Sequence, residues 1–301
     1  LLDCHFQAAL LYTDRFGIRK VRVINLVLAV CERLEDVFNF AEEDAIVATI
    51  VRDTLMFVGK QTFSDLRDSV NNKLVEVFTQ YRALLEINHH RPANSHLLYP
   101  ESLKHMAMYM LAFLKTNAMT LLAETSLDSR LADVYQLLDM PLETLMFRLY
   151  PALVELHSLR DHEALPLDAE DATSSLVIPE FKDLSSKSLQ DGVYILCDGL
   201  SVYVWVSKNT NPLLLKDLFG DNVNSIRDID PISDELPDLP TEISQKARNL
   251  VDFFQKNING CPTLHLAGII IVREDIDVAA QHFKSLLVED GPRGIGSGTP
   301  G

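Results

Sequence analysis

Two basic residues near the N-terminus, Lys20 and Arg22, have a spacing that could support ligand binding, and Arg19 stands beside them. In an extended strand, residues two positions apart share a face, which holds the two cations about 6–7 Å apart. Such a pair can clasp a carboxylate or an acidic peptide motif. We expect the charge of the pair to be uncompensated by its sequence neighbours; a solvated sheet face is the alternative interpretation.

The histidines give a weaker signal for metal binding. His89, His90, His96 and His105 fall near one connection. Zinc sites usually have closely spaced histidine pairs with cysteine or carboxylate partners, and this segment lacks them. We therefore interpret these residues as solvated loop histidines and expect no metal site.

Catalytic motifs are missing from the sequence. The glycines of 294–298 lack the lysine of a phosphate-binding loop and follow no predicted strand. No nucleophile elbow or Ser/His/Asp arrangement stands out, so nothing supports a hydrolase. The acidic run Glu42–Asp44 is expected to open a helix, where carboxylates favour the helix dipole. Trp205 is expected in the core. We predict that the chain is not an enzyme.

The overall charge excludes further classes of function. The chain has 301 residues, with 27 Lys and Arg against 43 Asp and Glu, giving a formal net charge of −16. This argues against sequence-independent nucleic-acid binding and against simple attraction to anionic lipid. No apolar run is long enough to span a membrane. The sequence opens without Met in strand-like residues, and we expect it to be part of a longer protein.

Three stretches must position these residues. Two β-like runs, 6–13 and 18–30, flank the turn 14–17 and predict a hairpin that belongs to a larger sheet. From about 35 to 150, apolar residues recur with helical spacing and predict an irregular bundle. The helices expected there are 44–58, one that starts at the capping sequence 62–65, 101–114, 129–138 and 142–149.

The third stretch alternates strands and helices. Buried strands are predicted at 193–197 and 200–206, joined by Asp198-Gly199, a strong hairpin signal. A short helix at 212–219, a long helix at 243–258, a strand at 264–272 and a helix at 278–288 follow. The glycine-rich and proline-rich tail, 291–301, is predicted to be flexible.

A series of motifs follows along the chain: Gln7–Thr13, Gly17–Val23, Tyr150-Pro151, Leu156-His157, Asp191–Leu196, Val204–Val206 and His282–Asp290. In this order they resemble the C-terminal part of the cargo-selecting adaptor family of the coat protein complex II (COPII) inner layer. The resemblance covers nearly the whole chain.

The resemblance implies a multi-domain α+β fold. Residues 1–34 would be the C-terminal strands of a β-sandwich, 35–150 an irregular all-α helical domain and 151–290 an α/β gelsolin-like domain, with 291–301 as the tail. A trunk domain and a zinc-finger module would lie further toward the N-terminus. No cofactor is therefore expected in this chain, and zinc only in that missing part.

The resemblance also implies a function. Family members bind sorting signals on the cytosolic tails of cargo and membrane-fusion proteins, for transport from the endoplasmic reticulum to the Golgi. A basic Arg-Ile-Arg strand motif of one family cargo pocket falls on Lys20 and Arg22, although lysine does not replace arginine in bidentate carboxylate binding. The expected partner is the GTPase-activating coat subunit, bound mainly through the trunk. The expected location is the cytosolic face of the endoplasmic reticulum and the vesicle coat, with peripheral membrane association.

Two other interpretations stay open at this point. The paralogous GTPase-activating subunit inserts an arginine into its GTPase, and Arg273 or Arg293 could serve. An actin-binding gelsolin relative would share the C-terminal domain, but such proteins repeat that module and carry calcium sites.

Overall fold

The computed structural model describes residues 2–87, 98–121, 125–168, 175–257 and 269–290. These residues form two compact units. Unit 1 takes its residues from 1–46 and 71–106, and unit 2 takes its residues from 47–70 and 107–301. The predicted tail, 291–301, and the glycines of 294–298 lie outside the described residues. No helix among the described residues has the length and hydropathy needed to cross a membrane.

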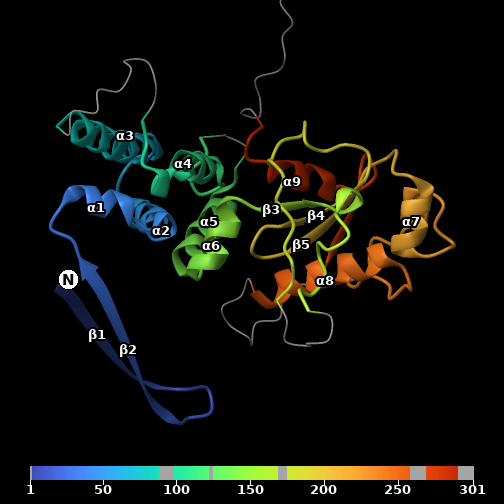
Figure 1. The fold of residues 1–301 in the computed structure, drawn as a ribbon, viewed down its shortest axis with the longest axis horizontal. Helices are drawn as coiled ribbons and strands as arrows, with labels where there is room; N and C mark the ends of the chain where they lie inside the picture. The colour runs from blue at the N-terminus through green and yellow to red at the C-terminus, as the bar shows by residue number, and fades with distance from the viewer. Residues whose placement is uncertain (1, 88–97, 122–124, 169–174, 258–268, 291–301) are drawn as a thin grey trace, which may run out of the picture. The chain divides into compact units, whose positions relative to one another are not determined.

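Unit 1 contains the predicted hairpin. Strands β1 (Leu2–Thr13) and β2 (Arg19–Val30) pair antiparallel, with Thr13 opposite Arg19 at the turn (Figure 1). Gly17 closes the turn with φ of +80°, a conformation that favours glycine. Every residue of β2 is exposed, which agrees with the expectation that the hairpin needs further partners.

The five helices predicted between 35 and 150 correspond to α2 (Glu43–Leu55), α3 (Phe63–Ile87), α4 (Met106–Lys115), α5 (Leu127–Asp139) and α6 (Leu142–Leu149). A further short helix, α1 (Leu34–Asn39), was not predicted. The capping sequence works as expected, because the Asp65 amide donates to Thr62 Oγ1 at 3.2 Å. The acidic residues Glu43 and Asp44 open α2, as predicted.

The predicted helix 101–114 is wrong in one respect, because it is interrupted. A 3₁₀ turn, η1 (Glu101–Leu103), precedes α4, which begins only at Met106. The backbone amide of His105 donates to Glu43 Oε1 at 2.8 Å. This contact comes from a residue 62 positions away, so periodicity within the segment gives no sign of it.

Unit 2 contains a four-stranded mixed sheet. Its strands are β3 (Ala152–Glu155), β4 (Val193–Cys197), β5 (Val202–Val206) and β6 (Ile270–Arg273), in that spatial order. The pairs β3–β4 and β4–β5 are antiparallel, and β5–β6 is parallel. The Asp198-Gly199 hairpin is confirmed, with φ of +81° at Gly199. Strand β3 was not predicted.

Helices cover both faces of this sheet. They are α7 (Pro212–Phe219), α8 (Glu242–Asn257) and α9 (Ala279–Ser285). Two 3₁₀ turns also belong to this unit: η2 (Leu156–Ser158) follows β3, and η3 (Ile226–Asp228) lies between α7 and α8. Figure 1 shows α8 and α9 on opposite sides of the strands. Strands covered on both faces have no solvent side, which explains why β4 and β5 are apolar at every position.

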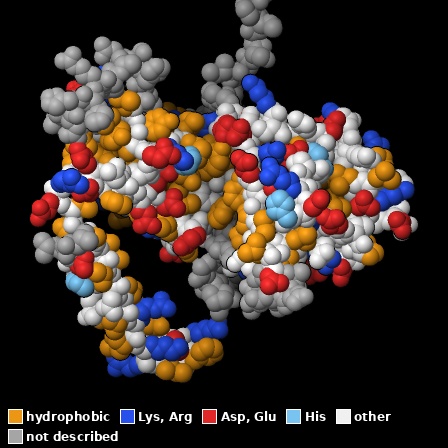
Figure 2. Space-filling view, viewed as in Figure 1, with side chains coloured by type: hydrophobic (Ala, Val, Ile, Leu, Met, Phe, Trp, Pro, Cys, Tyr) orange, Lys and Arg blue, Asp and Glu red, His pale blue; other side chains and the backbone are white. Residues whose placement is uncertain are grey.

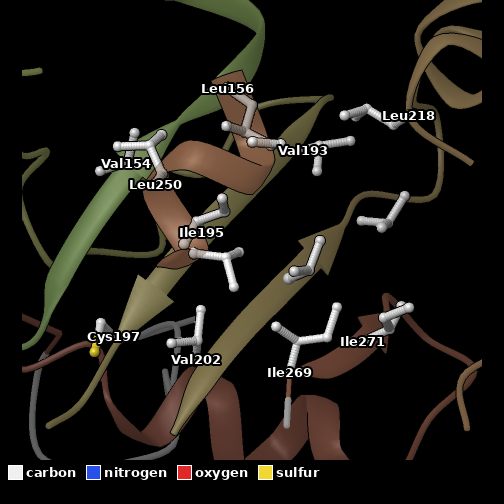
Figure 3. Close-up of a cluster of buried hydrophobic side chains, with 14 of the residues drawn as sticks. Val154, Leu156, Val193, Ile195, Cys197, Val202, Leu218, Leu250, Ile269 and Ile271 are labelled. Atoms are coloured by element: carbon white, nitrogen blue, oxygen red, sulfur yellow. The ribbon is translucent and has the colours of Figure 1, made fainter. Parts of the chain in front are cut away.

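The core on the α8 face is a row of aliphatic side chains. Val154, Ile195, Val204 and Ile271 occupy neighbouring register positions across the four strands, and all are buried. Leu250 of α8 belongs to the same cluster (Figure 3). Residues at alternate positions face the other way, so the two faces are packed independently.

The opposite face is aromatic. Trp205 is 1% exposed and stacks on Phe283 of α9, with ring centroids 4.6 Å apart. Its indole Nε1 donates to Ser207 Oγ at 3.1 Å, which satisfies its only polar atom. The core position predicted for Trp205 is confirmed.

A half-buried arginine, Arg148, joins helices α5 and α6 to the sheet within unit 2. Arg148 Nη2 lies 3.1 Å from Asp133 Oδ1, and its Nη1 lies 2.9 Å from Asp198 Oδ2. The other carboxylate oxygen of Asp198 accepts from the backbone amides of Leu200 and Ser201. One guanidinium thus compensates two buried carboxylates, and one of these also shapes the β4–β5 turn.

Candidate functional site

The predicted site residues lie at the turn end of the β1–β2 hairpin. Side chains of Lys and Arg gather there in the space-filling view (Figure 2). Lys20 and Arg22 share one face of β2, opposite Tyr12 and Leu10 of β1, and Arg19 lies on the other face. All three cationic residues are exposed. The structure therefore places the predicted pair on a common, solvent-accessible face.

The turn that holds this cluster is organised by Asp14. Its backbone amide donates to the Ile18 carbonyl at 2.9 Å, and its Oδ1 accepts from the amides of Phe16 and Ile18 at 2.9 and 3.0 Å. This side-chain-to-backbone pattern is typical of aspartate in turns. It sets the position at which β2 begins, and hence the spacing of the cations along β2.

One expectation about charge is wrong. Lys20 is compensated, because its Nζ lies 2.7 Å from Asp14 Oδ2. The ammonium of Lys20, together with the Ile18 amide, lowers the pKa of Asp14. Alternation of faces along the strand could not reveal this pair, since Asp14 lies in the turn. Arg22 has no ion-pair partner among the residues that the structure describes.

A fourth cation belongs to the same end of the hairpin and was missed from the sequence. Arg15 is exposed in the turn, and its guanidinium lies 4.8 Å from the centroid of the Phe16 ring. Its position next to Asp14 in a predicted turn was the available signal. With Arg19, Lys20 and Arg22, it completes what we call the basic patch.

The chemistry of the basic patch is electrostatic recognition. The patch offers guanidinium and ammonium groups on a hydrogen-bonded strand pair, and the described residues supply only Asp14 as a compensating carboxylate. Arginine can bind a carboxylate with two parallel hydrogen bonds, whereas lysine acts as a point charge. A guanidinium such as that of Arg22 can therefore hold a carboxylate with two hydrogen bonds, which the ammonium of Lys20 cannot do.

The described residues contain no group of three or more histidine, cysteine and acidic side chains that could hold a metal ion. His105 Nδ1 lies 3.3 Å from Glu43 Oε2, so this histidine has a local role in unit 1. His89, His90 and His96 lie outside the described residues.

The arginine proposed for a GTPase-activating role is bound internally. Arg273 Nη2 lies 2.7 Å from Asp277 Oδ1, its Nε contacts the same carboxylate, and its Nη1 donates to the Ile229 carbonyl at 3.0 Å. Its side chain is 13% exposed. An inserted catalytic arginine must extend from the surface, so this geometry disfavours Arg273. Arg293 lies outside the described residues.

Comparison with known proteins gives consistent matches. Residues 42–147 match the family model "Sec23/Sec24 helical domain". The chain is 32% identical over 297 residues to SED5-binding protein 3 of Saccharomyces cerevisiae, which covers 96% of this chain and 31% of that protein. It is 28% identical over 283 residues to human Protein transport protein Sec24B, covering 94% of this chain and 21% of the relative.

The fold also matches a solved structure. The crystal structure of the human COPII-coat protein Sec24c aligns with a TM-score of 0.73 at 24% identity, over 95% of this chain and 35% of that chain. The chain therefore spans about a third or less of the length of these relatives. The matches confirm the resemblance to the C-terminal part of the COPII cargo-adaptor family seen in the sequence, because residues 42–147 match the helical domain shared by Sec23 and Sec24, and a Sec24 relative aligns with 94% of the chain.

Proposed function

We propose that this chain is part of a non-enzymatic COPII coat subunit that selects cargo by binding sorting signals in cytosolic tails, for transport from the endoplasmic reticulum to the Golgi. The observation that carries the proposal is similarity to Sec24 proteins along nearly the whole chain. The human relative is named a protein transport protein, and the yeast relative is named for binding SED5. Cargo selection by this chain extends that similarity.

The domain assignment belongs to the same proposal. The exposed two-stranded hairpin is consistent with the last strands of a β-sandwich. The mixed sheet with helices on both faces is consistent with a gelsolin-like domain at 151–290. No cofactor is assigned to these residues, and the zinc finger implied by the family lies outside them.

The proposed assembly follows from the family. The partner is the COPII GTPase-activating subunit, bound as a heterodimer mainly through the trunk. The location is the cytosolic face of the endoplasmic reticulum and the vesicle coat, with only peripheral attachment to the membrane.

Within this proposal, the basic patch binds the acidic part of a sorting signal. Arg22 and Lys20 present parallel cations on one strand face, and a charge-assisted contact to a carboxylate contributes about 1.5–3 kcal/mol. The ion pair between Lys20 and Asp14 makes the two residues unequal in their contribution to ligand binding. Lys20 must exchange Asp14 for the ligand, whereas Arg22 has no such competitor among the described residues. Arg22 should therefore contribute more than Lys20.

The test is titration of a fluorescently labelled acidic cargo peptide. It should use the purified chain and a chimaera in which this chain replaces the matching segment of the yeast relative. Lys20→Ala with Arg22→Ala should weaken binding at least about tenfold. The single Arg22→Ala change should cost more than Lys20→Ala, and all losses should shrink as salt rises.

A control separates binding from folding. Exposed substitutions usually change stability by less than about 0.5 kcal/mol, so thermal unfolding should barely move. Equal affinities of the wild type and the double variant in the chimaera would reject the patch. A large fall in melting temperature would instead show that the pair stabilises the hairpin.

A further inference from the structure

A cleft in unit 2 has properties opposite to those of the basic patch. It has a volume of about 620 Å³ and lies among η2, the start of β4, and the first turns of α7 and α8. Its apolar lining includes Leu159, Leu214 and Ile243, which also pack against the sheet core. Leu213 adds an apolar side chain that is 68% exposed. The cleft therefore offers aliphatic contacts that are anchored by the core and open to solvent.

The charged residues of this cleft are mostly acidic. Asp161, Asp191, Asp217 and Glu242 contribute four carboxylates, and all four residues are exposed. The first two follow β3 and precede β4, whereas the others lie on α7 and α8. These carboxylates come from segments that are distant in sequence. The acidic character of the cleft therefore arises from the fold, since no single run of acidic residues supplies it.

The cleft has one lysine and no arginine in its lining. Lys246 is buried, with its side chain 5% exposed, and its Nζ lies 2.7 Å from Glu242 Oε1. The same Nζ donates to the Arg160 carbonyl at 2.8 Å. His157, the other basic group of the lining, is bound to Glu155 at 2.7 Å. Exposed charge at the cleft is therefore negative.

We propose that this cleft binds a short basic peptide segment of a partner protein, in which one or two bulky aliphatic side chains are flanked by lysine or arginine. The aliphatic side chains enter between the leucines and Ile243, and the flanking cations meet the carboxylates. Charge complementarity of this kind sets specificity and rejects wrong partners. The acidic peptides proposed for the basic patch would be repelled here, so the inference goes beyond the proposed function.

The test uses a fluorescein-labelled hexapeptide with two leucines between two pairs of lysines, titrated against the whole chain. Saturable binding is expected for this probe, and none for the matched peptide with glutamate in place of lysine. Neutralising Asp161→Asn with Asp217→Asn should weaken binding about three- to tenfold at low salt, the range for two exposed charge contacts. Among the described residues, the carboxylates of Asp161 and Asp217 form no hydrogen bond or ion pair. Both substitutions should therefore keep the fold.

A matched control removes the same number of charges elsewhere in unit 2. Asp139→Asn with Glu143→Gln changes two exposed carboxylates outside the cleft, and binding should be unchanged. Leu213→Ser should weaken binding at every salt concentration, since it removes apolar contact. Equal loss in the control pair, or equal binding of the glutamate peptide, would overturn the proposal. Lys20→Ala with Arg22→Ala should leave this binding intact, which separates it from failure of the basic patch.

Discussion

Lys20 and Asp14 form an ion pair at the turn of the hairpin, with Nζ and Oδ2 2.7 Å apart. The pair links the residue that shapes the turn to one of the two cations proposed to bind cargo. Lys20 is thereby held in place and partly neutralised. An acidic ligand that reaches Lys20 must compete with Asp14, so this carboxylate limits the affinity of the basic patch.

The first prediction tests this competition. Asp14→Asn removes the charge but keeps an oxygen that can accept from the Phe16 and Ile18 amides, as Oδ1 does now. Binding of a labelled acidic peptide should strengthen about two- to fivefold at low salt, as expected for release of one exposed ion pair. The gain should disappear at high salt. Asp3→Asn, at the far end of β1 opposite Ala29, is the matched control. Weaker binding by Asp14→Asn alone would show that its pair with Lys20 organises the patch.

The second prediction concerns acid stability. The guanidinium of Arg273 holds the pKa of Asp277 below its ordinary value of 3.8. A carboxyl whose pKa is lowered on folding contributes stability above its unfolded pKa, and loses it as pH falls through the folded pKa. The free energy of unfolding, measured in urea, should therefore fall more steeply below about pH 4 for the wild type than for Asp277→Asn. Parallel pH profiles for the two proteins would contradict this assignment.

The third prediction concerns the same arginine and catalysis. Because Arg273 is committed to Asp277 and the Ile229 carbonyl, Arg273→Ala should lower stability by about 1.5–3 kcal/mol. The chain should not stimulate GTP hydrolysis by the coat GTPase, with or without this substitution. Stimulation by the wild type that is lost in a folded Arg273→Ala variant would favour the GTPase-activating interpretation.

The fourth prediction concerns Arg148. Removing it leaves Asp133 and Asp198 buried, at 5% and 2% exposure, without their cation. Breaking a buried pair in this way costs about 3–5 kcal/mol. Fluorescence of Trp205, the single tryptophan, should report the loss for Arg148→Ala during urea unfolding. Arg227→Ala, at an exposed position of η3, should change stability by less than about 0.5 kcal/mol. Similar losses for both variants would argue against the buried network.

The fifth prediction concerns Gly192, just before β4. A Cβ there would lie 2.1 Å from Cε1 of the His157 ring. That ring is held by Glu155 at 2.7 Å and packs edge-on against Tyr194. Gly192→Ala should destabilise the chain by about 1–3 kcal/mol, the usual cost of overpacking. In a His157→Ala background the same change should cost clearly less, and equal costs in both backgrounds would show that the ring is not the obstacle.

Sequence patterns predicted those helices and strands whose ends and turns are fixed by residues within or next to the element itself. Helix α7 is an example, because Asn211 caps its start by accepting from the Leu213 amide, and Gly220 ends it with φ of +107°. The β4–β5 hairpin is another, because its turn residues and apolar strands coincide. In both cases the sequence neighbours supply the deciding interactions.

The remaining elements depend on partners far away in the sequence. Strand β3 has four residues, too few for a recognisable period, and it is defined by pairing of Ala152 with Cys197. The break before α4 depends on Glu43. The same holds for the candidate site. The strand position of Lys20 could be predicted from the sequence, but its ion pair with Asp14 could not, because that pair depends on the geometry of the closed turn.

The parallel pairing of β5 with β6 has a consequence for the order of folding. Tyr203 and Ile270 are register partners although they lie 67 positions apart in the sequence. Closing so long a loop costs more chain entropy than closing the β4–β5 hairpin, and contacts distant in sequence slow folding. We therefore expect the antiparallel strands and α8 to assemble first and β6 to dock last. During synthesis, the sheet would remain one strand short until residues beyond 270 had left the ribosome, with the β5 edge exposed to unwanted pairing until then.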